Sequence, residues 1–243
     1  MKLNITIAVA LLLVFAGCST QDLTKVLEAA GQTTTGTDPL TNAEVINGLR
    51  EALRTGTERS VQLTSAADGF WNNTRIRVPF PAEALKVKTT LEDIGMRKPV
   101  EDFERTLNKA AEEATKEAVP VFVDAITSMS ISDGFAILNG GEQAATTFLK
   151  EKTTAALMAK FKPVVAKATQ KVALTNYWKP LASAYNTAGL LTGAKAVDPD
   201  LDQYVTQKAI DGLFVMLADE EKKIRKDPLA RTTDLLRRVF GQQ

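Results

Sequence analysis

The sequence lacks the side chain on which most hydrolytic chemistry depends. It contains no histidine and a single cysteine, which removes the usual general base, the Ser-His and Cys-His mechanisms and any intrachain disulfide. No motif for a cofactor or a metal is present, so we predict neither. The carboxylates that remain as bases include four adjacent pairs: Glu92-Asp93, Glu101-Asp102, Glu112-Glu113 and Glu220-Glu221. Neighbours on a helix diverge by about 100°, and we therefore interpret these pairs as solvated helix surface.

The lone cysteine follows a segment typical of exported bacterial proteins. Residues 1–17 combine a lysine, the apolar run Ile5–Phe15 and the small residues Ala16-Gly17, in the order of a signal peptide. The run is shorter than the ~20 residues of a membrane span. Phe15-Ala16-Gly17-Cys18 resembles a lipobox, which implies cleavage before Cys18 and its acylation with palmitate-type chains. The alternative is an ordinary signal peptide followed by an incidental thiol.

The position after the cysteine bears on localisation. Ser19 stands where an aspartate would favour retention in the inner membrane. We therefore expect an outer-membrane lipoprotein of the cell envelope that faces the periplasm, with the membrane as a partner through its lipid anchor.

The segment Phe70–Pro81 (FWNNTRIRVPFP) has the most unusual composition in the chain. Alternation directs Arg75 and Arg77 to one side and their apolar neighbours to the other. Arginines flanked by aromatic residues are common at recognition surfaces. Trp71, Arg75, Arg77 and Phe80 are therefore our candidate residues for binding a partner or ligand. The alternative is that the apolar residues cover the core while both arginines lie in solvent and bind nothing.

Two further segments could meet anions. Gly140-Gly141 precedes a predicted helix whose first amides could bind an anion, although it lacks the P-loop pattern and we interpret it as a turn. The stretch 220–238 carries seven basic residues and could approach anionic lipids; the alternative is a solvated helix end. Thirty basic residues against twenty-nine acidic ones over the whole chain argue against a nucleic-acid partner.

The elements that position these residues are almost all helical. Apolar residues recur with helical period throughout, and we predict an all-α fold, an irregular multi-helix bundle with one short extended segment at 75–80. We expect Asn42 and Ser132-Asp133 to begin helices, Asp198-Pro199 to begin the late helix with the strongest apolar pattern, and Pro163 to separate two others. The predicted organisation is a signal peptide (1–17), an acylated N-terminus with a short helix and a Thr/Gly-rich tether (18–41), and a single helical domain (42–243).

Five stretches taken in order resemble one family of Gram-negative lipoproteins. They are Arg75–Pro81, Asn108–Glu112, Ala144–Phe148, Tyr204–Phe214 and Glu221–Pro228. Their order and spacing resemble the domain-of-unknown-function family 4197 from roughly residue 40 to the C-terminus. The resemblance implies an exported, lipid-anchored, all-helical protein and no particular reaction.

These observations favour a lipid-anchored envelope protein that acts as a non-enzymatic binding or scaffold module for an envelope protein or a lipid. Two alternatives stay open. One is a hydrolase that uses carboxylates alone, for which Asp124 and Asp133 are candidates. The other is a carrier of apolar ligands in a cavity between helices.

Overall fold

The computed structural model describes residues 40–170, 200–231 and 233–241, with a few isolated positions between 178 and 196. All of them belong to one compact unit, Leu40–Gln243. The fold is all-α, as predicted. Its α-helices are α2 (Asn42–Ser65), α3 (Leu85–Asp93), α4 (Arg97–Thr115), α5 (Ala118–Thr127), α6 (Ile131–Leu138), α7 (Ala144–Thr169), α9 (Leu201–Lys226) and α10 (Asp234–Phe240). Two 3₁₀ turns, Ala82–Ala84 and Pro228–Ala230, precede α3 and α10.

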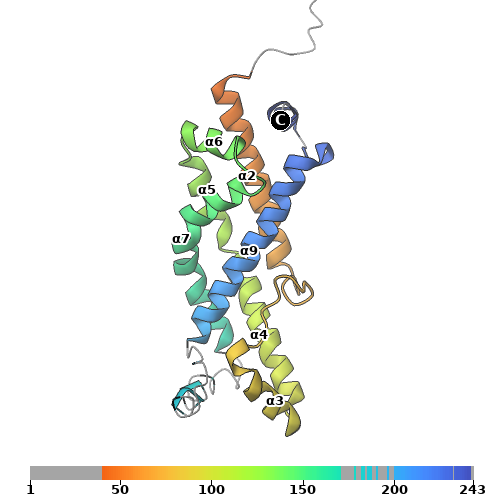
Figure 1. The fold of residues 1–243 in the computed structure, drawn as a ribbon, viewed down its shortest axis with the longest axis vertical. Coiled ribbons are helices and arrows are strands. Elements are labelled where there is room, and N and C mark those ends of the chain that lie inside the picture. Colours follow the sequence, from red (N-terminus) through yellow and green to blue (C-terminus); the bar gives the residue numbers. More distant parts are fainter. Residues whose placement is uncertain are drawn as a thin grey trace, which may run out of the picture. The chain divides into compact units, whose positions relative to one another are not determined.

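Helix α9 is the element around which the others pack. It contacts α7, α2 and α4, and α4 also packs along α7 (Figure 1). Its inward residues Val205, Ile210 and Leu213 are fully buried. Helices α5 and α6 pack on α2 and α7, whereas α3 packs on α4. Among the described residues no single helix has the length and hydropathy of a membrane span; one candidate arises by joining Arg97–Thr127 to Ile131–Leu138 across a bend of 107°.

Helix α7 is continuous, which corrects the predicted break at Pro163. The proline lies inside the helix, where it removes one hydrogen bond and costs about 3 kcal/mol. Buried residues recur at every fourth position on both sides of it, including Leu157, Phe161 and Val165, each with no exposed surface. A break would withdraw half of this stripe from the core, so tertiary packing outweighs the local preference.

The helix starts differ from the predicted ones by one to two residues. Thr41, not Asn42, caps α2: its hydroxyl accepts from the Glu44 amide, and the Glu44 carboxylate accepts from the Thr41 amide, which completes a capping box. Ser130 and Asp133 form the same box at α6, so Asp133 completes the cap and Ser132 lies within the helix. Asp200 caps α9 by accepting from the amide of Gln203 at 2.8 Å; residues 198 and 199 lie outside the described residues.

The connection between α2 and α3 carries the predicted recognition segment. Its extended stretch is shorter than predicted, because the amides of Ile76 and Arg77 both donate to the Asn73 carbonyl and form a turn. The alternation holds nonetheless, since Ile76, Val78 and Phe80 are at most 5% exposed. Gly212 of α9 permits the close approach of this connection, because a Cβ there would lie 2.6 Å from the Phe70 ring.

Candidate functional site

Two buried polar side chains of α4 hold the connection 66–81 in place. Asn108 accepts from the Val78 amide at 2.8 Å and donates to the Val78 carbonyl at 2.8 Å, as a neighbouring strand would. One turn along, Glu112 accepts from the Phe70 amide at 3.2 Å. Both side chains are at most 6% exposed. Helix α4 therefore fixes the backbone of this connection at Phe70 and at Val78.

The Glu112 carboxylate is buried, which is unfavourable for its charged form. Burial raises its pKa above the ordinary value, and the nearby Asp68 carboxylate adds to that effect. Hydrogen bonds from the amides of Phe70, Trp71 and Asp68 oppose the rise without cancelling it. Asp68 adopts a positive φ of 58°, an uncommon conformation for a residue other than glycine. The carboxylate thus serves as the acceptor around which residues 68–71 are folded.

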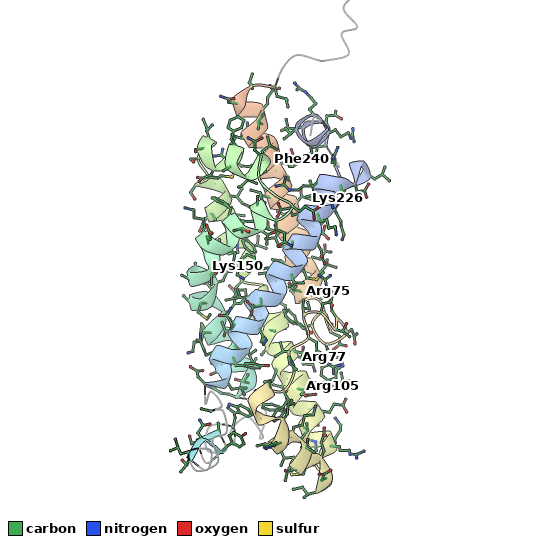
Figure 2. The ribbon with its side chains drawn as sticks, in the orientation of Figure 1. Arg75, Arg77, Arg105, Lys150, Lys226 and Phe240 are labelled. Atoms are coloured by element: carbon green, nitrogen blue, oxygen red, sulfur yellow. The ribbon has the colours of Figure 1, made fainter. Side chains whose placement is uncertain are left out.

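Two arginines stack on the tryptophan that this loop presents. The Arg77 guanidinium carbon lies 3.4 Å from the centroid of the Trp71 ring, and that of Arg105 on α4 lies 4.4 Å from it. The Nε of Arg105 donates to Glu101 at 2.8 Å. The Arg77 side chain makes no hydrogen bond or ion pair with a described residue. We call Trp71, Arg77 and Arg105 the tryptophan–arginine cluster; Figure 2 shows both arginines on the side of the 66–81 connection.

The other predicted recognition residues have different surroundings. Arg75 forms a two-point ion pair with Asp219 on α9, with Nη1 and Nη2 at 2.5 and 3.2 Å from the carboxylate oxygens. Phe80 is 2% exposed and packs on Phe103 and Trp178, with ring centroids 5.2 and 5.7 Å away. Phe80 therefore lies in the core, and of the four predicted residues only Trp71 and Arg77 come together at the surface. The sequence analysis did not predict Arg105 as part of this surface, because its position beside Trp71 follows only from the fold.

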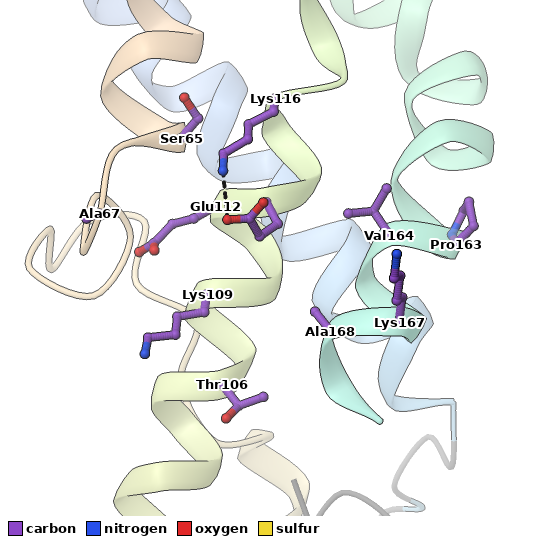
Figure 3. Close-up of a pocket in the computed structure, with 11 residues that line it drawn as sticks. Ser65, Ala67, Thr106, Lys109, Glu112, Lys116, Pro163, Val164, Lys167 and Ala168 are labelled. Carbon is purple, nitrogen blue, oxygen red and sulfur yellow. Dashed lines mark hydrogen bonds and ion pairs between the residues drawn. The ribbon is translucent and has the colours of Figure 1, made fainter. Parts of the chain in front are cut away.

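A cleft of about 800 Å³ opens between α4 and α7, next to the end of α2. Lys109 and Lys116 lie on its α4 side and Lys167 on its α7 side (Figure 3). Thr106, Val164 and Ala168 line its wall. Lys109 is one helical turn from Arg105, so that the two residues share a face of α4 and the cleft adjoins the tryptophan–arginine cluster. We call it the α4–α7 cleft.

Comparison with known proteins places the whole helical unit in one family. The model of a family described as protein of unknown function, DUF4197, matches residues 39–241. The chain belongs to the DUF4197 family. No curated protein and no solved structure matches it. The matched range includes the arginine-bearing segment Arg75–Pro81 and the buried Asn108 and Glu112 of α4.

Two of the four acidic pairs depart from the predicted solvated surface, whereas Glu92-Asp93 and Glu101-Asp102 lie at the surface as predicted. Glu112, Glu220 and Glu221 are at most 7% exposed. Glu221 accepts from the amides of Ala145 and Thr146 at 3.0 and 2.8 Å, and it pairs with Arg225 at 3.0 Å. The start of α7 after Gly140-Gly141 therefore does bind an anion, as helix N-termini can, and that anion belongs to the chain itself.

The arrangement of carboxylates does not favour the hydrolase alternative. Asp124 is exposed on α5, and Asp133 is engaged in its capping box, which lowers its pKa. In the α4–α7 cleft, Glu112 is bonded to the loop and Glu113 to Lys116 at 2.7 Å. Within the described residues, no group of three or more acidic residues is placed to hold a metal ion.

The basic C-terminal stretch is largely committed to internal contacts. Arg225 donates to the Ile137 carbonyl at 2.8 Å, and Arg231 donates to the Ile224 carbonyl at 3.1 Å. Arg238 pairs with Glu44 on α2 at 2.9 Å. These contacts tie α9 and α10 to the rest of the unit, so the stretch is mainly structural. Residues 1–39, which hold the predicted signal peptide, Cys18 and all of the predicted tether except Leu40 and Thr41, lie outside the described residues.

Proposed function

We propose that this chain is a lipid-anchored, non-enzymatic binding module of the cell envelope. In this proposal Cys18 carries the acyl chains, and the tryptophan–arginine cluster receives an anionic group of an envelope partner. The observation that supports the proposal best is Arg77. Its guanidinium is stacked 3.4 Å from the Trp71 centroid, while its N–H groups have no acceptor among the described residues.

The stacking prepares Arg77 for recognition. A guanidinium presents its donors in the plane of the group, and stacking one face on an indole leaves those edge donors available for a carboxylate or phosphate. It also fixes a side chain that would otherwise lose considerable conformational freedom on binding. Arg105, over the same ring at 4.4 Å, adds a second positive charge. A lysine would keep the charge at either position but lose the planar fork.

The anchor gives the module its place in the cell. Two or more acyl chains make membrane attachment long-lived, at about 0.8 kcal/mol for each buried methylene. In this proposal the Thr/Gly-rich segment Gly31–Thr41, which the sequence predicts to be a tether, lies between the acylated Cys18 and the helical unit. We propose that the mature protein is held at the outer membrane, facing the periplasm, where partners within reach of such a tether are envelope proteins or lipids.

The recognition proposal is tested by exchanging one arginine at a time. We expect Arg77→Lys to reduce the recovery of a crosslinked envelope partner several-fold, while the melting temperature stays within about 2 °C. Arg75→Lys is the matched control, because it makes the same change two residues away in a side chain that already has Asp219 as its partner. Equal recovery with all three proteins would contradict the proposal.

The anchor is tested separately. Cys18→Ala should abolish labelling with a palmitate analogue and leave an uncleaved or a soluble form of the protein. Cys18 is the only cysteine in the chain, so label that persists in this variant cannot be a thioether and would refute the lipoprotein assignment. The Arg77→Lys variant should label like the wild type, which separates anchoring from recognition.

A further inference from the structure

The α4–α7 cleft combines cationic rims with an apolar wall. Lys109 on α4 and Lys167 on α7 are exposed and lie on opposite sides of it (Figure 3). Between them, Val164 and Ala168 are partly buried residues that pack against the core and also face the cleft. A ligand that fills this space meets positive charge at the rims and methyl groups at the wall.

The acidic residues of the cleft are already engaged. Glu113 is bonded to Lys116 at 2.7 Å, so that pair is neutral. Glu112 is directed to the loop, where it accepts from the Phe70 amide. Lys109 and Lys167 form no ion pair with any described residue. The charge available to a ligand in the cleft is therefore positive, and it comes from two different helices.

We propose that the α4–α7 cleft binds an anionic amphiphile. Its phosphate or carboxylate head contacts Lys109 and Lys167, and its apolar body covers Val164 and Ala168. A volume of about 800 Å³ lies within the roughly 300–1,000 Å³ range of small-molecule sites. This site goes beyond the proposed function, because it uses none of the residues of the tryptophan–arginine cluster and takes a small ligand instead of a macromolecular partner.

The nature of the ligand follows from the interaction that each part of the cleft offers. A simple anion such as inorganic phosphate satisfies the lysines but leaves the apolar wall in water. A neutral hydrocarbon covers the wall but gains nothing from the rims. Each methylene buried on the wall should tighten binding about fourfold. An anion with an attached alkyl chain gains from both and is the preferred ligand.

The test uses dodecyl phosphate below its micelle concentration, titrated calorimetrically into the mature chain. We expect one site for each chain and affinity that falls as the alkyl chain is shortened to hexyl. Dodecanoate should bind comparably, whereas inorganic phosphate and dodecyltrimethylammonium should bind at least about a hundredfold more weakly. Tight binding of inorganic phosphate would identify a plain phosphate site and overturn the proposal, as would equal binding of the cationic detergent.

Charge reversal at the rims tests the placement. Lys109→Glu with Lys167→Glu turns two attractions between exposed charges into repulsions and should weaken dodecyl phosphate binding roughly tenfold or more. Lys160→Glu is the matched control, because Lys160 is exposed on α7 and does not line the cleft. Unchanged affinity in the double variant, with an unchanged helical circular dichroism spectrum, would overturn the proposal.

The two binding proposals can fail independently. Arg77→Lys leaves the cleft intact and should retain the affinity for dodecyl phosphate. If the amphiphile binds but no partner depends on Arg77, only the recognition proposal fails. If dodecyl phosphate does not bind to the wild type, the cleft proposal fails whatever the pull-down shows. An acidic peptide that binds in the cleft, with dodecyl phosphate unable to displace it, would likewise refute the amphiphile.

Discussion

Glu221 provides the sharpest test of how this fold is held together. Its carboxylate accepts three hydrogen bonds at the start of α7, from the amides of Ala145 and Thr146 and from the Thr146 hydroxyl at 2.7 Å. It also pairs with Arg225, whose side chain is 12% exposed. One side chain of α9 therefore accepts hydrogen bonds from the start of α7 and also balances the charge of Arg225 on α9 itself.

The expected loss follows from what Glu221→Ala leaves behind. Two amide donors, a hydroxyl and a largely buried guanidinium lose their acceptor, and Arg225 keeps only its bond to the Ile137 carbonyl at 2.8 Å. Removing one partner of a buried ion pair typically costs 3–5 kcal/mol, and we expect a loss of about that size in the free energy of unfolding. Glu221→Gln keeps an acceptor oxygen without the charge, so its loss should be smaller, about 1.5–3 kcal/mol.

Urea denaturation followed by circular dichroism measures these differences, and amide hydrogen exchange should show faster exchange at Ala145 and Thr146. Glu113→Ala is the control, since that carboxylate is 56% exposed and pairs with Lys116 within one turn of α4; its loss should stay below about 1 kcal/mol. If Glu221→Ala costs no more than this control, the carboxylate does not hold α7, and the explanation of its burial is wrong.

Three further changes test other parts of the fold. Leu213→Ala, at a side chain with no exposed surface, should lower the free energy of unfolding by about 2–5 kcal/mol. A loss below about 0.5 kcal/mol would mean that this face of α9 does not face the core. Gly212→Ala puts a Cβ 2.6 Å from the Phe70 ring and should cost about 1–3 kcal/mol, whereas an unchanged urea midpoint would mean that the loop is not packed there. Because the pKa of Glu112 is raised in the folded state, stability should fall as the pH rises from its ordinary value near 4.5 through the raised one. Glu112→Gln should abolish that fall, and an identical pH profile in the variant would contradict the assignment.

The sequence was sufficient to predict the fold class because the apolar stripes of this chain are long. In α9 the apolar residues of the periodic pattern, such as Val205, Ile210 and Leu213, are buried. The helix ends were predicted less well, although the decisive signal was present. Thr41 and Glu44 are spaced as a capping box requires, and that reciprocal pair selects Thr41 over the neighbouring Asn42.

The surface residues could be predicted only in part, because their surroundings come from distant segments. Alternation correctly placed Arg77 outward, but no local pattern indicates that Arg105 joins it at Trp71 or that Asp219 lies beside Arg75. Phe80 looked like part of the same surface, since aromatic residues next to prolines and arginines suit both a rim and a core. The two aromatic rings on which Phe80 packs, those of Phe103 and Trp178, are far from it in the sequence, so no local pattern indicates that it is buried.

The buried carboxylates show why a helical pattern alone misplaces charge. Glu220 and Glu221 diverge on α9 as neighbours must, and a helix with one packed face would leave at least one of them in water. Helix α9 instead has partners on several sides. Glu220 lies 3.7 Å from Arg59 on α2, while Glu221 reaches the start of α7. Both are buried because this helix has protein where a peripheral helix would have solvent.

This burial also changes how the charge composition should be interpreted. The chain is almost neutral, with thirty basic and twenty-nine acidic residues. Three glutamates are at most 7% exposed, whereas no lysine or arginine among the described residues is buried to that extent; the Arg225 side chain, for example, is 12% exposed. The exposed charge of the described unit is therefore more positive than the composition indicates. Anions are consequently the ligands that this surface favours, at the tryptophan–arginine cluster and at the α4–α7 cleft alike, and higher salt should weaken binding at both sites because exposed charges are screened.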